Sequence, residues 1–497
     1  MPSLLELVFR PYARFRAAKL RRQGEQAGEI QKRLLGKLLN QARATAFARD
    51  HGLTPETTYE QFRNAVPVRD YEALRPYVDR VVKGEADVLW PGRPLYLAKT
   101  SGTTSGTKYI PLTRECMPYH VQGAQDAFSL YIARTGNSSF LNGKMLFLSG
   151  SPELEKNPAG LATGRLSGIA QHYVPSWLQR NRIPKWETNC IEDWETKVDK
   201  IAEEAVQVDL RLISGIPPWV QMFFERVTQR TGKKPAEVWP NLKLYIEGGV
   251  DYSPYESLLT EAMGRKLDLV EVFPASEGFI AVQAGPFGQG LMLMPKYGIF
   301  YEFIQLDTYF TATPKRIPLW EVEVGVPYAL IMTTNAGLWA YDIGDTVEFT
   351  STRPYLLKVA GRVKHFLSAF GEHVIEQEVT AALLAATQAT GAVVTDFTVA
   401  PKVTEPRRHE WFIEFATPPA DPIRFQQVLD DTLRQKNMYY EDLRKGDILA
   451  PAQVYSLPAN AFREYMKSIG KLGGQNKIPR LKNDRQLADP LMQMLTP

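Results

Sequence analysis

The chain has 497 residues, a length that predicts two or three domains rather than one hydrophobic core. Lys and Arg together exceed Asp and Glu by only 4, so the overall charge does not indicate a nucleic-acid partner. Two cysteines, Cys116 and Cys190, are too few for a disulfide framework or a thiolate metal site, which is typical of a protein from the reducing cytoplasm.

The first 65 residues are expected to be helical, because 29–52 carries apolar residues at i, i+3 and i+4 spacing. Much of the positive charge lies in 9–23. The simplest interpretation of this segment is an amphipathic helix with a solvated outer face, and contact with a membrane surface or anionic lipid is the alternative. No apolar run approaches the ~18 residues of a membrane span, and no apolar segment typical of a signal peptide follows the basic residues.

The middle of the chain alternates between strand and helix patterns. The expected strands are 94–99, 144–150, the start of 210–227, 242–249 and 267–278. The expected helices are 71–85, 193–207 and the rest of 210–227, and Asp193 is expected to cap the second of them. The segments 291–295, 299–306 and 327–349 then indicate a β-rich meander. This order predicts an α/β protein whose large N-terminal domain has mixed or parallel sheets flanked by helices plus a β-rich part.

The pattern changes around 361–371. After it come two helix patterns, 372–391 and 421–437, and two strand patterns, 395–401 and 409–418. We therefore expect a large domain over 1–362 and a small α+β domain over 363–497, with a hinge near 361–371.

A run of small hydroxyls and glycines, SGTTSGTK, extends from Ser101 to Lys108. Between a strand and a helix, such a loop directs backbone N–H groups and hydroxyls into one concavity, which favours phosphate binding over a plain exposed turn. The residues expected to take part are Ser101, Gly102, Thr103, Thr104, Ser105, Gly106 and Lys108. The glycine–lysine spacing is not that of a Walker A loop, and Tyr109 stands where that motif has its magnesium-binding hydroxyl.

The run resembles the phosphate loop of adenylate-forming enzymes, which join a carboxylate to the α-phosphate of ATP and expel pyrophosphate. The resemblance extends to VFPASEG at 272–278, where it implies that Phe273 stacks on adenine, that Ser276 lies in the nucleotide site and that Glu277 holds Mg²⁺. Taken alone, Glu277 could equally be a solvated loop carboxylate.

Three later segments also resemble that superfamily. In YDIGD, Tyr341 and Asp345 are implied to lie at the nucleotide, with Asp345 on the ribose hydroxyls; alone, Asp345 could be a turn residue. In GRVKHF, Arg362 would contact ribose or phosphate and Lys364 would mark the pivot. In GGQNKIPR, Lys477 would be the mobile catalytic lysine. Lys471 and Lys482 are rivals for that last role, and any of the three could be a plain surface lysine.

More of the chain is similar to one branch, the auxin-responsive Gretchen Hagen family of acyl-acid amido synthetases. The similarity is carried by 65–113, 213–227, 273–279 and the QNKIPR ending, and it spans about 31–480. It implies the adenylate-forming fold with a mobile small domain. It also implies a two-step ligase that uses ATP and Mg²⁺, in which Lys477, Glu277 and Arg362 are catalytic and an amino acid amine accepts the acyl group. A bacterial-type member is expected.

Two other functions remain open: acyl transfer to coenzyme A or a carrier thiol, and a non-catalytic nucleotide-binding module. His120 and His172 could be acceptor-side bases or packed histidines, and Trp177, Trp219 and Tyr245 could line an acyl pocket or belong to the core. We expect small-molecule acid and amino acid substrates, no nucleic acid, no membrane span and a monomer.

Overall fold

The computed structural model describes residues 4–101, 107–174, 176–249, 252–311, 313–363, 366–367, 369–370, 372, 374–473 and 477–495. Contacts group the chain into two units: unit 1 comprises 1–250 and 266–359, and unit 2 comprises 251–265 and 360–497. No sequence pattern separated 251–265 from its neighbours. The expected boundary after residue 362 and the hinge at 361–371 concern movement between domains and stay predictions.

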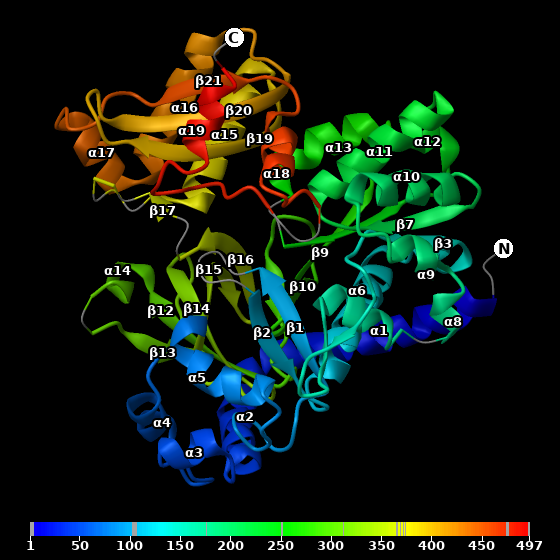
Figure 1. The fold of residues 1–497 in the computed structure, drawn as a ribbon, viewed down its shortest axis with the longest axis vertical. Helices are drawn as coiled ribbons and strands as arrows, with labels where there is room; N and C mark the ends of the chain where they lie inside the picture. The colour runs from blue at the N-terminus through cyan, green and yellow to red at the C-terminus, as the bar shows by residue number, and fades with distance from the viewer. Residues whose placement is uncertain are drawn as a thin grey trace. The chain divides into compact units, whose positions relative to one another are not determined.

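A mixed sheet of twelve strands, counted over the described residues, forms the frame of unit 1 (Figure 1). Its strands, in spatial order, are β13 (Arg316–Pro318), β12 (Ile299–Gln305), β14 (Pro327–Thr334), β15 (Tyr341–Thr352), β16 (Tyr355–Arg362), β11 (Leu291–Leu293), β10 (Gly278–Gln283), β9 (Asp268–Ala275), β8 (Leu244–Gly248), β7 (Leu210–Ser214), β3 (Lys144–Phe147) and β6 (Arg182–Ile183). The neighbouring strands β9, β8, β7, β3 and β6 pair parallel with one another. The pairs β9–β10, β10–β11 and β11–β16 are antiparallel, and so are the pairs β15–β14, β14–β12 and β12–β13. The predicted α/β class with a β-rich part is confirmed.

Unit 1 also contains α-helices. They are α1 (Leu4–Glu25), α2 (Ala27–Ala42), α3 (Ala46–Asp50), α4 (Tyr59–Ala65), α5 (Tyr71–Val82), α6 (Met117–Thr135), α7 (Leu166–Gln171), α8 (Ser176–Gln179), α9 (Trp186–Asn189), α10 (Trp194–Ala205), α11 (Pro217–Thr231), α12 (Pro235–Val238) and α14 (Leu306–Tyr309). Side chains of α1 and α6 share one core with the parallel strands. Helices α10 and α11 run alongside each other next to these strands (Figure 1).

Side-chain caps mark where several helices begin. The predicted cap Asp193 accepts a hydrogen bond from the Thr196 N–H at 2.8 Å and starts α10. Thr45 and Thr58 cap α3 and α4 in the same way, which divides the expected N-terminal helical region into separate helices. Asp70 caps α5 and thereby fixes where the next residue, Tyr71, emerges.

A glycine allows α6 to approach the sheet closely. A Cβ on Gly123 would lie 2.3 Å from the ring of Phe279 on β10, so no larger residue fits without movement of the helix or of that ring. Beside this core, a second sheet has the order β2 (Thr107–Leu112), β1 (Tyr96–Ser101), β5 (Ala162–Gly164) and β4 (Glu155–Lys156). This smaller sheet carries the hydroxyl-rich segment. None of the described helices is long and apolar enough to cross a membrane.

Over its described residues, unit 2 contains a three-stranded sheet with helices on both faces and a separate two-stranded sheet. Its elements are the 3-10 turn η2 (Ser253–Tyr255), α13 (Glu256–Met263), β17 (Phe366–Leu367), β18 (Val374–Ile375), α15 (Glu376–Thr390), β19 (Val393–Lys402), β20 (Arg408–Thr417), α16 (Pro422–Lys436), α17 (Met438–Lys445), β21 (Gln453–Leu457), α18 (Ala461–Ser468) and α19 (Ala488–Gln493). Trp411 and Ile413 of β20 face the core formed with α15 and α16, whereas Phe412 between them faces α18 and α19. This alternation confirms the expected α+β character.

Candidate active site

The hydroxyl-rich segment connects two antiparallel strands. Ser101 at the end of β1 pairs with Thr107 at the start of β2, and Thr100 pairs with Lys108. The expectation that a helix follows the segment is therefore wrong, because α6 begins only at Met117. Tyr109 and Ile110 explain the strand, since aromatic and β-branched residues favour extended pairing. The predicted phosphate contacts Gly102, Thr103, Thr104, Ser105 and Gly106 lie outside the described residues.

Lys108 lies over an aromatic ring from α5. Its Nζ is 5.4 Å from the centroid of the Tyr71 ring, a cation–π distance. The Tyr71 hydroxyl accepts a hydrogen bond of 2.9 Å from the Tyr109 N–H. Burial raises the pKa of Tyr71, so its phenol stays neutral. Sequence reasoning missed Tyr71, although its place directly after the Asp70 cap marked it as the first residue of a helix.

Tyr341 joins this group from β15. The Asp342 N–H donates to the carbonyl of Arg69 at 2.8 Å, and the Arg69 N–H donates to the carbonyl of Ala340 at 3.1 Å. These bonds hold the start of β15 beside the residues that precede α5. The Tyr341 side chain is buried, which raises its pKa well above the usual value, and the Glu277 carboxylate raises it further. Glu277 and Tyr71 are both close enough to act electrostatically on Tyr341.

Glu277 and Ser276 form a two-residue turn between β9 and β10. Ala275 pairs with Gly278 across this turn, and both turn residues are half-buried. The turn thus presents the Glu277 carboxylate at the strand ends, near Tyr341. Phe273, expected to stack on adenine, is 6% exposed and packs into the core of the antiparallel half of the sheet. Its adenine contact therefore stays a prediction.

Asp345 lies on a β-bulge. Opposite β14, the pairing jumps from Ile331–Asp342 to Ala329–Thr346, so 343–345 bulge out of the ladder. Gly344 takes φ +83°, which a residue with a side chain adopts rarely, and its N–H donates to Oδ1 of Asp342 at 2.8 Å. The YDIGD segment thus combines buried Tyr341 with a bulge that orients Asp345, which is itself buried.

Arg362 ends β16 and is exposed, within unit 2. The preceding Gly361 has φ +130°, and a Cβ there would lie 2.6 Å from Cβ of Glu376, so the backbone passes close to the start of α15. A large side chain at Gly361 would therefore push the end of β16 away from α15. The expected pivot residue Lys364 lies outside the described residues.

Three C-terminal lysines were candidates for catalysis. Lys471 and Lys477 are exposed, whereas Lys482 is half-buried with its Nζ 3.4 Å from Asp484. The segment after Lys477 is fixed to β19. The Val399 N–H donates to the carbonyl of Arg480 at 2.9 Å, and the Lys482 N–H donates to the carbonyl of Val399 at 3.1 Å. Lys477 therefore stands just before a short, firmly held segment.

A buried arginine holds that segment. Arg480 pairs with Asp396, donates to the carbonyl of Phe397 at 3.0 Å and contacts the hydroxyl of Tyr255. Its guanidinium lies 4.4 Å from the Phe397 ring centroid and 5.5 Å from that of Tyr255. Burial alone would lower the pKa of Arg480, but the Asp396 carboxylate raises it. Sequence reasoning gave Arg480 no role, and nothing local to the motif indicated its distant partners.

Three of the remaining candidates, His120, Trp219 and Tyr245, are buried side chains. His120 is buried, which lowers its pKa to about 4, and His172 lies 2.9 Å from the carbonyl oxygen of Pro152 through Nε2. Trp219 and Tyr245 are buried. The side chain of Trp177 lies outside the described residues. His172 itself is exposed, so only His120 is a packed histidine.

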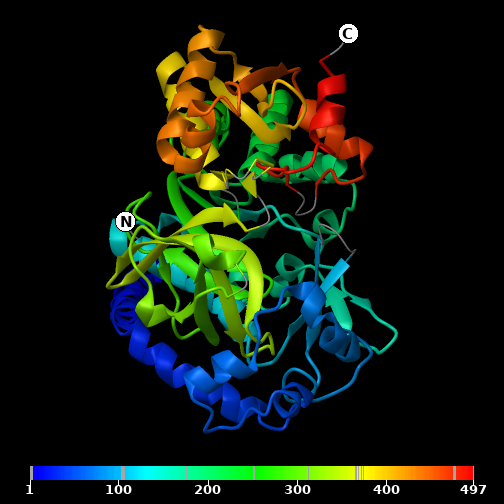
Figure 2. The same ribbon diagram turned by 90° about the vertical axis from the view of Figure 1, so that its left-hand side faces the viewer.

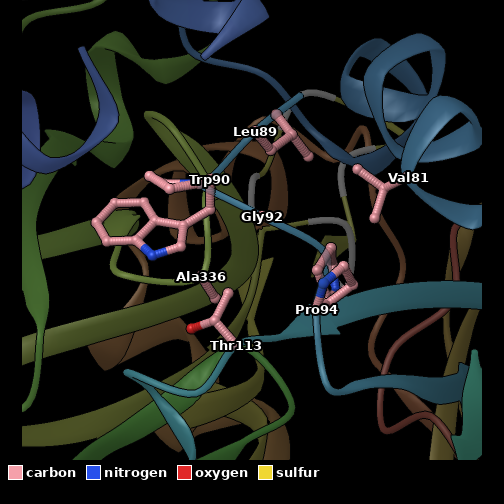
Figure 3. A pocket seen from close by; sticks show the side chains of 9 residues that line it. Val81, Leu89, Trp90, Gly92, Pro94, Thr113 and Ala336 are labelled. Carbon is pink, nitrogen blue, oxygen red and sulfur yellow. The ribbon is translucent and has the colours of Figure 1, made fainter. Parts of the chain in front are cut away.

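A small pocket lies elsewhere in unit 1 (Figure 3). Its lining is mostly apolar and comes from the last turn of α5 and the chain after it, from β2 and its exit, and from the β14–β15 turn: Val81, Leu89, Trp90, Pro91, Gly92, Pro94, Pro111, Thr113 and Ala336. None of the predicted nucleotide-binding residues lines it. Figure 3 shows Ala336 beside Thr113, and the lining residues include none of the charged groups that a nucleotide or carboxylate requires.

Comparison with known families identifies the chain. The GH3 family N-terminal domain matches residues 16–188, the central domain matches 291–362 and the C-terminal domain matches 377–486. The chain belongs to the GH3 family. This is the Gretchen Hagen family that the motifs resembled, so that assignment is confirmed. The expectation of a bacterial-type GH3 protein is not supported by these matches and stays a prediction.

Similar proteins support the fold of this GH3 member. The jasmonoyl–L-amino acid synthetase JAR4 of Nicotiana attenuata is 24% identical over 389 residues, and the match spans 65% of this chain and 66% of JAR4. The solved AtGH3.15 acyl acid amido synthetase in complex with 2,4-DB has a TM-score of 0.79 at 19% identity, covering 96% and 95% of the two chains. A 2-hydroxyisobutyryl-CoA ligase in the postadenylation state, in complex with an acyl-AMP, reaches 0.62 at 14% identity, covering 94% and 91%. These structures share the adenylate-forming fold.

Proposed function

We propose that this GH3 protein is an ATP-dependent ligase that adenylates a carboxylic acid and then transfers the acyl group to the amine of an amino acid. Membership of the GH3 family carries the proposal, because relatives such as JAR4 and AtGH3.15 are named as amido synthetases. The gathering of Lys108, Tyr71, Glu277 and Tyr341 supports it, since it joins elements from three separate parts of the sequence.

The first step brings a carboxylate to a polyphosphate, two anions that repel each other. Donors from Ser101 to Gly106 and the ammonium of Lys108 hold the phosphates, and Lys477 stabilises the charge that develops between carboxylate and α-phosphate. Arg362 contributes a second positive charge. Asp345 accepts hydrogen bonds from the ribose, beside Tyr341 and Ser276, and Phe273 contacts the adenine.

Glu277 fits a magnesium ligand. It is a half-buried carboxylate in a tight turn, and its negative charge acts on Tyr341. Within the described residues, no three His, Cys, Asp or Glu side chains gather to hold a metal. A single carboxylate suits Mg²⁺, which commonly takes its other ligands from substrate phosphates and water. Mg²⁺ bound there would neutralise charge on the polyphosphate.

The second step requires an amine held in line with the adenylate in a site that excludes water. We propose that the small domain over 363–497 pivots near 361–371 between the steps and exchanges the groups presented to the adenylate. The acid is apolar or aromatic. Few cysteines support a location in the reducing cytoplasm, and we propose a monomer.

Carboxylate-dependent exchange of labelled pyrophosphate into ATP tests the proposal. The full chain is incubated with aromatic, indolic, jasmonate-like and fatty acids, and AMP release is then measured with pooled amino acids or with coenzyme A. We expect exchange with one acid class and a rise in AMP release with amino acids only. A rise with coenzyme A alone would replace the amide ligase by a thioester ligase. Binding of ATP without exchange for any acid would contradict the proposed activity.

A further inference from the structure

Helix α1 has two different faces. Its inner face is made of small and apolar residues, with Ala13, Ala17 and Leu20 almost fully buried in the core shared with α6. Arg16 secures this contact through a bidentate ion pair with Asp126, with both N–O distances at 2.7 Å. The attachment of α1 to unit 1 therefore uses the inner face only, and α1 lies on the outside of that unit in both views (Figures 1 and 2).

The outer face of α1 is apolar and exposed along its centre. Four large apolar side chains lie on it: Leu7, Val8, Tyr12 and Phe15, with exposed fractions of 56%, 62%, 51% and 70%. Val8, Tyr12 and Phe15 follow i, i+4 and i+7 spacing, so they form one stripe. Single exposed apolar residues are ordinary on protein surfaces, but four on fewer than three turns of one helix form a patch.

Basic side chains lie near this stripe, and no acidic residue lies among them in the sequence. Arg14, Lys19, Arg21 and Arg22 are exposed on the outer face and form no ion pair within the described part of the chain. At 100° per residue, Arg14 and Arg21 lie on one flank of the stripe, whereas Lys19 and Arg22 continue the stripe toward the C-terminal end of the helix. No Asp or Glu occurs between residues 7 and 23. The nearby Glu6 and Asp126 are buried and are engaged with Arg10 and Arg16.

We propose that the outer face of α1 docks the protein onto anionic membrane surfaces, with the helix lying in the plane of the interface. The apolar side chains enter the boundary between headgroups and acyl chains, and the neighbouring cations contact lipid phosphates and carboxylates. Long Arg and Lys side chains reach the headgroups while their aliphatic parts stay in apolar surroundings. The inference is independent of the ligase activity.

The charge and composition of the outer face of α1 favour an anionic membrane over a second copy of the chain or a nucleic acid. A symmetric contact between two copies through this face would bring the same cations together, and no carboxylate of the face offsets their repulsion. A nucleic acid would match the cations but would leave Val8 and Phe15 without apolar surroundings, because such interfaces are mainly polar. An anionic bilayer satisfies both properties at once.

Vesicle flotation of the full chain tests the proposal. We expect binding to phosphatidylcholine vesicles that contain phosphatidylserine, little binding to pure phosphatidylcholine vesicles, and loss of binding as salt is raised. The double variants Val8→Gln/Phe15→Gln and Arg14→Gln/Lys19→Gln should each lower the partition coefficient by about tenfold. Pyrophosphate exchange should stay unchanged in both, because none of the substituted residues belongs to the proposed catalytic or nucleotide-binding residues.

Matched controls separate this face from general surface properties. Ile423 and Met438 in unit 2 are 72% and 69% exposed, so Ile423→Gln/Met438→Gln removes comparable apolar surface. Lys37→Gln/Lys358→Gln lowers the net charge by the same amount as the α1 charge variant. Both controls should bind vesicles like the natural chain. Equal binding to neutral and anionic vesicles, or unchanged binding by the α1 variants, would overturn the proposal. Self-association that depends on Val8 and Phe15, or RNA binding without vesicle binding, would overturn it in favour of another partner.

Discussion

At the scale of single residues, the site depends on charges placed by distant contacts. Lys477 is exposed, but three residues later Arg480 is buried between two aromatic rings and paired with Asp396. An uncompensated buried guanidinium would be costly, so the Asp396 carboxylate and the Phe397 carbonyl keep this point of the chain in one place. A flexible lysine gains precision when the chain beside it is anchored in this way.

Lys477→Ala should lower the rate of pyrophosphate exchange by roughly 100-fold or more, since it removes charge stabilisation that operates in the transition state. ATP affinity, measured by calorimetry, should change little. Lys471→Ala and Lys482→Ala serve as controls and should retain most of the exchange rate. A large loss in either of those variants, with Lys477→Ala active, would reassign the catalytic lysine.

The role of the Tyr255 hydroxyl in the Arg480–Asp396 cluster can be tested by comparison with a second buried cluster of tyrosine, aspartate and arginine. In unit 2, Tyr440 donates to Asp430 at 2.6 Å, and Arg444 pairs with the same carboxylate at 3.0 Å. Tyr255→Phe and Tyr440→Phe should each lower the free energy of unfolding by roughly 1–2 kcal/mol, because each leaves a buried charged group short of a partner. Only Tyr255→Phe should also slow pyrophosphate exchange. That slowing should vanish in the Lys477→Ala background; equal slowing by both Tyr variants would indicate a general loss of stability.

At the scale of elements, strand ends and helix starts assemble the site. The turn between β9 and β10, the start of β15 and the start of α5 place Glu277 and Tyr71 within electrostatic reach of Tyr341. Each element supplies one or two residues, so the site exists only when the sheet and α5 are packed. In unit 2, the start of α15 has its own polar arrangement at Glu378, which accepts from the Ile375 N–H at 2.9 Å and from Asn437 at 3.0 Å.

Glu378 makes the stability of unit 2 depend on pH. Burial raises the pKa of Glu378 to about 7 in the folded protein, above its value in the unfolded chain. A raised folded pKa means that this stability is fully present below the unfolded pKa and is lost as pH rises through 7. Glu378→Gln should therefore become more stable than the natural chain as pH rises from about 4.5 to 8. Urea unfolding at several pH values measures this, and a constant difference would contradict it.

At the scale of the whole molecule, the chain passes between the two units at 250–251, 265–266 and 359–360. Unit 2 is therefore connected to unit 1 at three points of the chain. The hinge expected at 361–371 accounts only for the last of these connections. If the small domain moves, the helix α13 either travels with it or breaks the Tyr255 contacts to Arg480. The buried Arg480 cluster favours joint movement, because separation would expose a desolvated ion pair.

Joint movement predicts which distances change. Spin labels at positions 261 and 445, both in unit 2, should keep one distance when a sulfamoyl adenylate mimic binds. Labels at 37 and 445, in different units, should shift if the small domain pivots. Pulsed electron resonance on the two labelled pairs makes the comparison. A change in the 261–445 distance would show that α13 stays behind, and no change in either pair would remove the pivot.

The sequence by itself determined the family, the order of the motifs, the α/β class and local features such as the Asp193 cap, because these depend on residue identity and short-range periodicity. It did not determine that the hydroxyl-rich segment joins two strands, that Tyr71 belongs with Glu277 and Tyr341, or that Tyr255 contacts Arg480 across 225 residues. Only the tertiary structure decided these, because contacts between distant residues follow from how whole elements pack, and no local pattern records which element lies beside which.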